Sequence, residues 1–371
     1  MSTKKHVRVS ELAITLALFE VGSTSLFLIG GEAKQDAWLA MLIGAVAGFL
    51  LLCLHLSIHR MEPKLDLFQL FRQYTGKYLG GLINLSFIGY FALEASRNLR
   101  DMGEVTLTVL LPGTPLLSVM FIIILVVSNT VRYGPEVLFL ICLVILPFVA
   151  LGYAIIAIMV MATGLIHFNH MLPVLEHGWG PVLKSAIPGI LSFPFGQVVV
   201  FLAFYPLSAA RPQIMSKVMN AYCLSSLFLI FINQINILVL GPVLASNSAL
   251  PLLQTVQLIE LTEVFERIDP IFALVLFLSL GIKLAVFFSG AVVGATRTIG
   301  MSQKKATALI GAIIFALGFI SPTYTEFIKV GREIAVKYWW PIFQIGLPVF
   351  LLIVMLLRRK KRTSSQPEPG A

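Results

Sequence analysis

Residues 192–197 read Ser-Phe-Pro-Phe-Gly-Gln and interrupt the sixth of the long apolar runs in the chain. Pro194 lacks a backbone N–H and its ring collides with the preceding helical turn, while Gly196 adds a flexible point two residues later. In lipid, an irregular backbone is tolerated only where it faces protein or a cavity. The stretch therefore predicts a broken helix whose freed amides and carbonyls are available to a ligand.

The apolar runs around this break are long enough to cross a membrane. About 20 mostly apolar residues suffice for one helical span. Ten segments qualify, namely residues 10–30, 36–59, 80–111, 116–131, 135–163, 183–207, 215–243, 267–296, 305–321 and 338–357. Backbone amides in lipid must be satisfied internally, so we expect helices. The sequence predicts an all-α integral membrane protein of about ten transmembrane helices.

The overall composition supports a lipid environment. Of the 371 residues, 58% are hydrophobic and 12% are charged, whereas a soluble domain has about 45–50% apolar and roughly 25% charged residues. Too little polar material remains to cover a soluble globule. The net charge of +9 does not indicate a nucleic-acid partner, because the basic residues lie mostly between and after the apolar runs, where they set membrane topology.

The distribution of Lys and Arg predicts the orientation. With the N-terminus inside, most of the 27 Lys and Arg residues fall on the cytoplasmic side, as the positive-inside rule requires. The charges at residues 329–337 are the discordant patch. Residues 60–79 predict an amphipathic helix on the inner surface. We expect a single transmembrane domain at residues 1–362, both chain ends in the cytoplasm, and a disordered tail at residues 363–371.

The first span contains a second weak point. Residues 19–25 read Phe-Glu-Val-Gly-Ser-Thr-Ser, and glycine with a Ser/Thr cluster competes with helical hydrogen bonding. A packing face of small residues is the alternative interpretation. The two weak points fall in the first and sixth helices, at matching positions of two five-helix halves (residues 10–163 and 183–357). Such pairs point to the midplane site of an inverted-repeat, LeuT-like fold.

A site between two broken helices suits a ligand with both charges. Half-helix N-termini favour a carboxylate, and freed carbonyls favour an ammonium group or a cation. An α-amino acid carries both groups. The candidate ligand-binding residues of the two breaks are Val21, Gly22, Ser23, Thr24, Phe193, Pro194, Phe195, Gly196 and Gln197.

The third span carries a polar stripe with helical spacing. Its members are Tyr90, Glu94, Arg97, Asn98, Asp101 and Glu104. Charged residues inside a span are costly and face a cavity or a partner. One interpretation is a self-paired network in which Glu94, Arg97 and Asp101 interact and Arg100 pairs with Glu104. The other is a ligand site, for which Tyr90 and Glu94 are the deeper candidates.

Lys283 lies near the centre of the eighth span. A lone lysine there should be neutral, paired or extended toward the membrane surface. Its central position disfavours extension to the surface. It either pairs with an unwound-helix carbonyl in place of a sodium ion or bridges helices structurally.

No enzyme motif is present in the sequence. There is no Walker loop, no GxSxG motif and no paired-histidine spacing. His167, His170 and His177 fall in one predicted outer loop, and we interpret them as loop residues and not as metal ligands. We expect no catalysis, no metal and no cofactor.

Several patches give the chain a family resemblance. They are Leu-Pro-Gly-Thr-Pro at 111–115, Met-Leu-Pro-Val-Leu-Glu-His-Gly at 171–178, the break at 192–197 with the residues that follow it, and Phe-Glu-Arg-Ile-Asp-Pro-Ile-Phe at 265–272 with Lys283 beyond. In this order they resemble the B subunit of bacterial spore germinant receptors. These endospore germination permeases fall within the amino acid–polyamine–organocation group.

The resemblance implies a ten-helix LeuT-like fold and a nutrient sensor in the spore inner membrane. It also implies A and C subunits as partners and a small germinant, often an amino acid such as alanine. Carried over by position, the ligand pocket would involve residues 22–24, Tyr90 and residues 193–197. The family commonly has glutamate where this chain has Gln197, which puts a typical proton-coupled cycle in doubt.

Three functions fit these features. The chain could be a sensor that reports ligand binding to partner subunits, a secondary transporter of amino acids or amines, or a component of an ion or water channel. The sensor and the transporter need the same binding site, so the residues alone do not separate them. The resemblance favours the sensor, which needs only a difference in affinity between two states.

Overall fold

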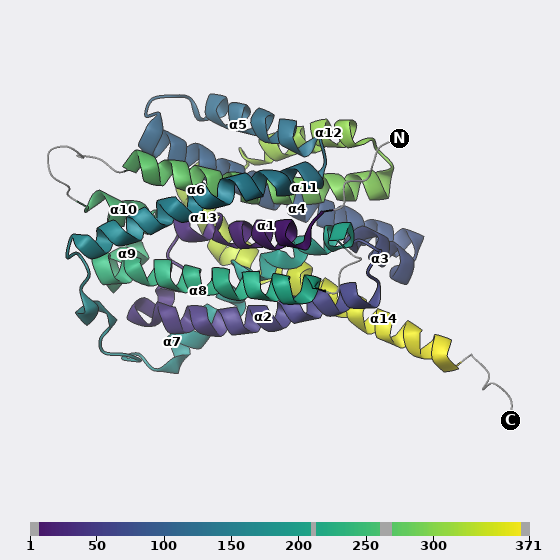
Figure 1. Ribbon diagram of the computed structural model, residues 1–371, viewed down its shortest axis with the longest axis horizontal. Helices are drawn as coiled ribbons and strands as arrows, with labels where there is room; N and C mark the ends of the chain where they lie inside the picture. Colours follow the sequence, from purple (N-terminus) through teal and green to yellow (C-terminus); the bar gives the residue numbers. More distant parts are fainter. Residues whose placement is uncertain (1–6, 209–212, 260–268, 365–371) are drawn as a thin grey trace.

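The computed structural model describes residues 7–208, 213–259 and 269–364, and every regular element in these ranges is a helix (Figure 1). The α-helices are α1 Val9–Val21, α2 Ala37–Met61, α3 Leu67–Thr75, α4 Lys77–Val105, α5 Leu116–Val131, α6 Pro135–Ala162, α7 Trp179–Lys184, α8 Ile214–Leu240, α9 Pro242–Asn247, α10 Pro251–Gln257, α11 Asp269–Ile299, α12 Gln303–Leu317, α13 Tyr324–Val330 and α14 Leu347–Ser364. The predicted all-α class is confirmed for this part of the chain.

Eight helical segments of the described residues are long and apolar enough to cross a membrane. Their bounds are Val9–Leu26, Gly31–Met61, Lys77–Leu110, Pro135–Ala162, Trp179–Ala203, Ile214–Leu240, Phe272–Ile299 and Tyr324–Arg359. The two other predicted spans, 116–131 and 305–321, form the shorter helices α5, with 16 residues, and α12, with 15 residues. The protein is therefore a multi-pass membrane protein in which the predicted ten segments comprise eight long and two short helices.

Several predicted features fall wholly or partly outside the described residues. These are the basic N-terminus through residue 6, Arg211, most of the motif at 265–272, and residues 365–371 of the predicted disordered tail. Residues 363 and 364 of that tail are the last two residues of α14.

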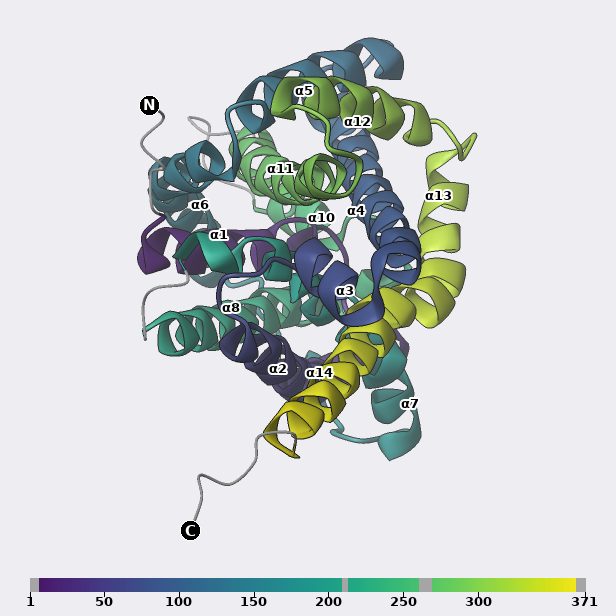
Figure 2. The same cartoon turned by 90° about the vertical axis from the view of Figure 1, so that its right-hand side faces the viewer.

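The long helices lie side by side, so their connections gather at two ends of the molecule. In Figure 1 the start of α1, α3 and the end of α14 lie at the right, whereas α7, α9 and α10 lie toward the left. Figure 2 looks onto the α3 end. Arg358 there donates to the carbonyl oxygen of Gln73 at 3.4 Å. This is the end that sequence predicts to face the cytoplasm, and that assignment of sides stays a prediction.

Two spans form the centre of the bundle. α1 contacts α6, α8 and α11, and α11 contacts α4 and α6 (Figure 2). Both central helices carry buried polar side chains, including Glu20 on α1 and Lys283 on α11. Such groups are far too costly to face lipid. These two spans therefore lie inside, and the more uniformly apolar α5 and α6 present exposed apolar side chains at the outside.

Small residues let α11 approach its neighbours closely. A Cβ on Gly290 would lie 2.8 Å from Val200 Cγ2, and one on Gly294 would lie 2.6 Å from Ile88 Cγ1. Close backbone approach of this kind compensates for the weak hydrophobic drive between helices in lipid. It fixes α11 against α4 and against the segment that follows the Pro194 break.

α3 begins at a capping box. Asp66 Oδ1 accepts hydrogen bonds from the amides of Phe68 (3.1 Å) and Gln69 (2.9 Å), and its Oδ2 lies 2.9 Å from Nε of Arg297 on α11. Burial raises the pKa of Asp66, although these hydrogen bonds and Arg297 oppose the shift. The apolar side chains of α3 are buried against protein and do not lie on a lipid surface as predicted: Leu67, Phe68, Leu70 and Phe71.

We expect Asp66→Ala to destabilise the protein by about 1–2 kcal/mol, because it removes the helix cap together with the ion pair. Arg297→Met removes only the ion pair, whose arginine side chain is 54% exposed, and should cost less than about 1 kcal/mol. Thermal unfolding of both variants in lipid nanodiscs measures the difference. Equal losses would show that the cap contributes nothing beyond the pair.

Candidate ligand site

The first span is interrupted at Gly22. α1 ends at Val21, and the hydroxyl of Thr24 then donates to the carbonyl oxygen of Glu20 at 2.6 Å within a short 3-10 turn. A Cβ on Gly22 would lie 2.6 Å from Cδ of Lys283. The position therefore accepts only glycine, because the stem of a buried lysine fills the space beside it.

The sixth span is interrupted over a longer stretch. After α7 the backbone contains a non-helical residue at Ile187, turns at Pro194, and continues as a 3-10 helix at Phe195–Ala203. A Cβ on Gly196 would collide with the side-chain oxygen of Gln344. The predicted break is present, and its second half is wound more tightly than an α-helix.

A cavity of about 650 Å³ lies between these interruptions and α4. Six residues singled out from the sequence line it: Ser23, Glu94, Arg97, Asp101, Phe193 and Gln197. Exposed charged residues also line it, namely Glu32, Lys184, Arg332 and Lys337. The cavity therefore extends from the charged, exposed surface near α7 to buried polar groups of α4.

The buried part of the cavity is a cluster of hydrogen-bond acceptors. Nε2 of Gln197 donates to Oε2 of Glu94 at 2.8 Å, and Nδ2 of Asn98 donates to the backbone oxygen of Glu94 at 2.8 Å. The other Glu94 oxygen and the amide oxygens of Asn98 and Gln197 have no hydrogen-bond partner among the described residues. Buried acceptors rarely stay unpaired in a native protein.

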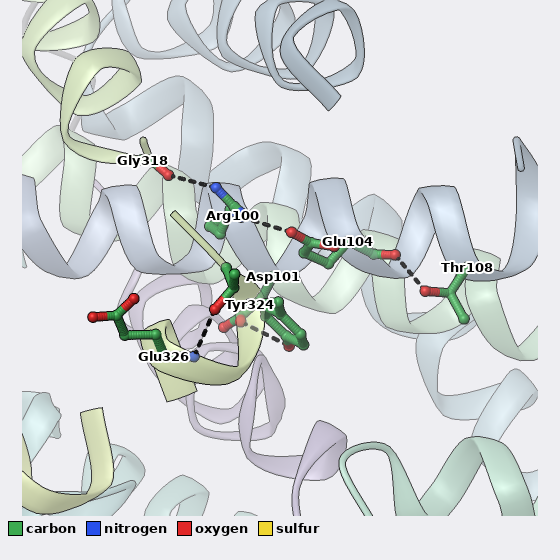
Figure 3. Close-up of polar contacts among 8 residues, drawn as sticks. Arg100, Asp101, Glu104, Thr108, Gly318, Tyr324 and Glu326 are labelled. Atoms are coloured by element: carbon green, nitrogen blue, oxygen red, sulfur yellow. Dashed lines mark hydrogen bonds and ion pairs between the residues drawn. The ribbon is translucent and has the colours of Figure 1, made fainter. Parts of the chain in front are cut away.

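Farther along α4, the predicted self-paired network is only partly formed (Figure 3). Arg100 and Glu104 pair at 2.8 Å, as expected. Asp101 instead accepts from the hydroxyl of Tyr324 at 3.1 Å. Arg97 has no ion pair with a described residue, and its guanidinium lies 4.4 Å from the ring centroid of Phe327. The positive charge of Arg97 is thus left facing the cavity.

Lys283 is fully buried beside the cavity and does not line it. Its Nζ lies between two aromatic rings, 5.1 Å from the centroid of Phe19 and 4.9 Å from that of Phe193. No described residue accepts a hydrogen bond from it. Cation–π attraction is therefore the direct contact that holds this ammonium group.

The other predicted residues do not line the cavity. They are Val21, Gly22, Thr24, Tyr90, Pro194, Phe195 and Gly196. Tyr90 is typical of them: its hydroxyl accepts from Nε2 of Gln344 at 2.8 Å, and its ring stacks on Phe343 with centroids 4.7 Å apart. These positions are buried and do not line the cavity in this conformation.

Sequence reasoning missed part of the site. Asn98 belongs to the predicted stripe but was not singled out as a ligand contact, although its spacing from Glu94 was the available signal. Glu20, whose two oxygens are buried and unpartnered in the described part of the chain, lies inside the first motif. Trp340 and Arg332 line the cavity from the last span, and no periodicity indicated them.

The described residues contain no group of three His, Cys, Asp or Glu side chains that could bind a metal ion. His167 and His170 lie with ring centroids 5.4 Å apart, and Nδ1 of His170 lies 3.0 Å from the backbone oxygen of Leu238. This contact attaches the loop to the end of α8.

Comparison with known proteins gives one consistent result. A family described as "Spore germination protein" matches residues 6–327. The chain is 30% identical over 368 residues to spore germination protein KB of Bacillus subtilis (strain 168), covering 98% of both chains. Spore germination proteins A2 and YndE of the same strain are 25% identical over 344 residues (88% of each chain) and 22% identical over 332 residues (88% and 89%). With a family match across most of its length, the chain belongs to the spore germination protein family.

Proposed function

We propose that the chain is the nutrient-sensing B subunit of a spore germinant receptor and that its ligand is a small amino acid. The observation that carries the proposal is the cavity, which leads from a charged surface to unpaired acceptors beside two interrupted helices. Unpaired buried acceptors and an unpaired guanidinium are complementary to the two charges of a zwitterion. Family membership supplies the setting, spore germination.

In this proposal the receptor's A and C subunits read the conformation of the membrane-embedded helices. The protein lies in the spore inner membrane with the α3 end in the cytoplasm, which agrees with the positive-inside distribution of Lys and Arg. The ligand shifts the conformational equilibrium by its difference in affinity for two states. The two halves of the bundle correspond to a LeuT-like inverted repeat.

A transporter is the second candidate, and the paired interruptions favour it. Helices broken at matching positions are the usual site of alternating access. Sensor and transporter therefore share a binding site and differ in whether the ligand crosses the membrane.

Flux separates these two functions. In proteoliposomes, we expect saturable binding of a radiolabelled small amino acid without accumulation, since a sensor needs no complete transport cycle. The measurement compares bound and internalised label with and without sodium and proton gradients. Concentrative uptake driven by either gradient would show that the protein is a transporter and not a sensor. An ion leak that needs no gradient of the ligand or coupling ion would indicate a channel.

Filling either interruption should abolish the response. Gly22→Leu and Gly196→Leu place side chains against Lys283 and Gln344, and overpacking of this kind costs about 1–3 kcal/mol. We expect more than about a tenfold rise in the nutrient concentration for half-maximal germination. Membrane insertion should be unchanged.

The matched control is Gly89→Leu on α4, where nothing lies within 4 Å of an added Cβ. Germination is followed as loss of optical density of spores that carry each variant with its partner subunits. A normal response in Gly22→Leu or Gly196→Leu would remove that interruption from the site.

Lys283→Met should change the response far more than Lys329→Met. Lys283 is completely buried, and its removal leaves the buried Glu20 without a nearby counter-charge, which is strongly destabilising. Lys329 is exposed, and surface substitutions usually change stability by less than about 0.5 kcal/mol. The same germination assay and thermal unfolding in nanodiscs test this. Small and equal effects would leave Lys283 a replaceable packing residue.

A further inference from the structure

The chemistry of the cavity floor defines what it can bind. Glu94, Asn98 and Gln197 are 1%, 3% and 1% exposed, and each presents one acceptor oxygen without a partner in the described part of the chain. Hydrogen-bond chemistry orients both amides when Glu94 is ionised. An ionised carboxylate only accepts hydrogen bonds, so Gln197 must present its nitrogen to Glu94 and keep its oxygen free. Asn98 likewise uses its nitrogen on a backbone carbonyl.

The three free acceptors outnumber the free buried donor near them, the indole nitrogen of Trp340, and so suit a group that only donates. A primary ammonium group has three N–H donors and no acceptor. Its positive charge also compensates the buried carboxylate of Glu94, and charge-assisted hydrogen bonds are the strong ones. A carboxylate at the same place would face three oxygens and be repelled.

Arg97 provides the opposite preference in the same cavity. It lies three residues after Glu94 on α4, so the two side chains are neighbours on the helix surface. Its guanidinium rests on the ring of Phe327 and has no ion pair with a described residue. A planar guanidinium held in this way binds a carboxylate through two parallel hydrogen bonds.

We propose that Glu94, Asn98 and Gln197 bind the ammonium group of an α-amino acid while Arg97 binds its carboxylate. This rests on the proposed function, in which the cavity holds the nutrient. The ligand then lies along α4, with its amino group toward the floor. The side chain of Lys283 does not occupy the proposed binding position of the ligand's ammonium group. Its Nζ lies between the rings of Phe19 and Phe193 and forms no ion pair with Glu94. α4, and not the broken helices alone, supplies both charged contacts.

The test measures binding to the whole protein in lipid nanodiscs. The twenty standard amino acids are the first probes. The tightest of them is then compared with its N-acetyl and carboxamide derivatives. In the unmodified protein each derivative should bind at least about tenfold more weakly, because each loses one charge-assisted contact.

Two variants identify which contact belongs to which group. In Glu94→Gln, the affinity for the amino acid should fall at least about tenfold. The N-acetyl derivative should then bind this variant less than about threefold more weakly than the amino acid does. In Arg97→Met, the amino acid and its carboxamide derivative should instead bind with equal affinity. Asn98→Ala, which removes one acceptor and keeps the fold, should weaken binding of the amino acid by about threefold and leave the N-acetyl derivative unchanged.

Glu326→Gln and Lys329→Met are the matched controls, since they change exposed charges on α13 that do not line the cavity. Both should bind like the unmodified protein. Unchanged binding in Glu94→Gln and Arg97→Met, or a reversed pairing of variants and derivatives, would overturn this assignment and leave the proposed function standing. Failure of every standard amino acid to bind the unmodified protein would instead overturn the proposed function.

Discussion

The arrangement of the site depends on one buried cation. Lys283 extends from α11 with its stem against Gly22 and its ammonium group between the rings of Phe19 and Phe193. It thereby contacts both interrupted spans at once. A desolvated cation–π contact contributes about 2 kcal/mol, which is small against the cost of burying an ion. Glu20, Glu94 and Asp101 add electrostatic attraction without an ion-pair contact to it.

This position links the ligand cavity to the core. Phe193 lines the cavity on one side and covers Lys283 on the other. A ligand that displaces Phe193 would therefore uncover a buried charge and change the packing of α1 against α11. Under the proposed function, the ring of Phe193 is the contact through which the ligand would act on the core. A sensor needs no more than such a difference between two states.

The helices and their interruptions could be predicted from the sequence, because both follow from local chemistry. Apolar length defines a span, and Gly22, Pro194 and Gly196 weaken a helix wherever they stand. The residues that pack against the polar face of a helix could not be predicted. Helical spacing placed Glu94, Arg97 and Asp101 together, but Asp101 bonds Tyr324 and Arg97 stacks on Phe327, both from α13. A partner that comes from a distant segment leaves no periodic signal.

The glutamine at position 197 determines the charge of the buried pair that it forms with Glu94. In this structure its nitrogen bonds the carboxylate of Glu94 at 2.8 Å. A glutamate at this position would bring two carboxylates to the same distance, and one of them would have to hold a proton. Gln197 removes that requirement, because its N–H donor stabilises an ionised Glu94. The buried negative charge is then available to a ligand cation rather than committed to a shared proton, which favours recognition over proton coupling at this position.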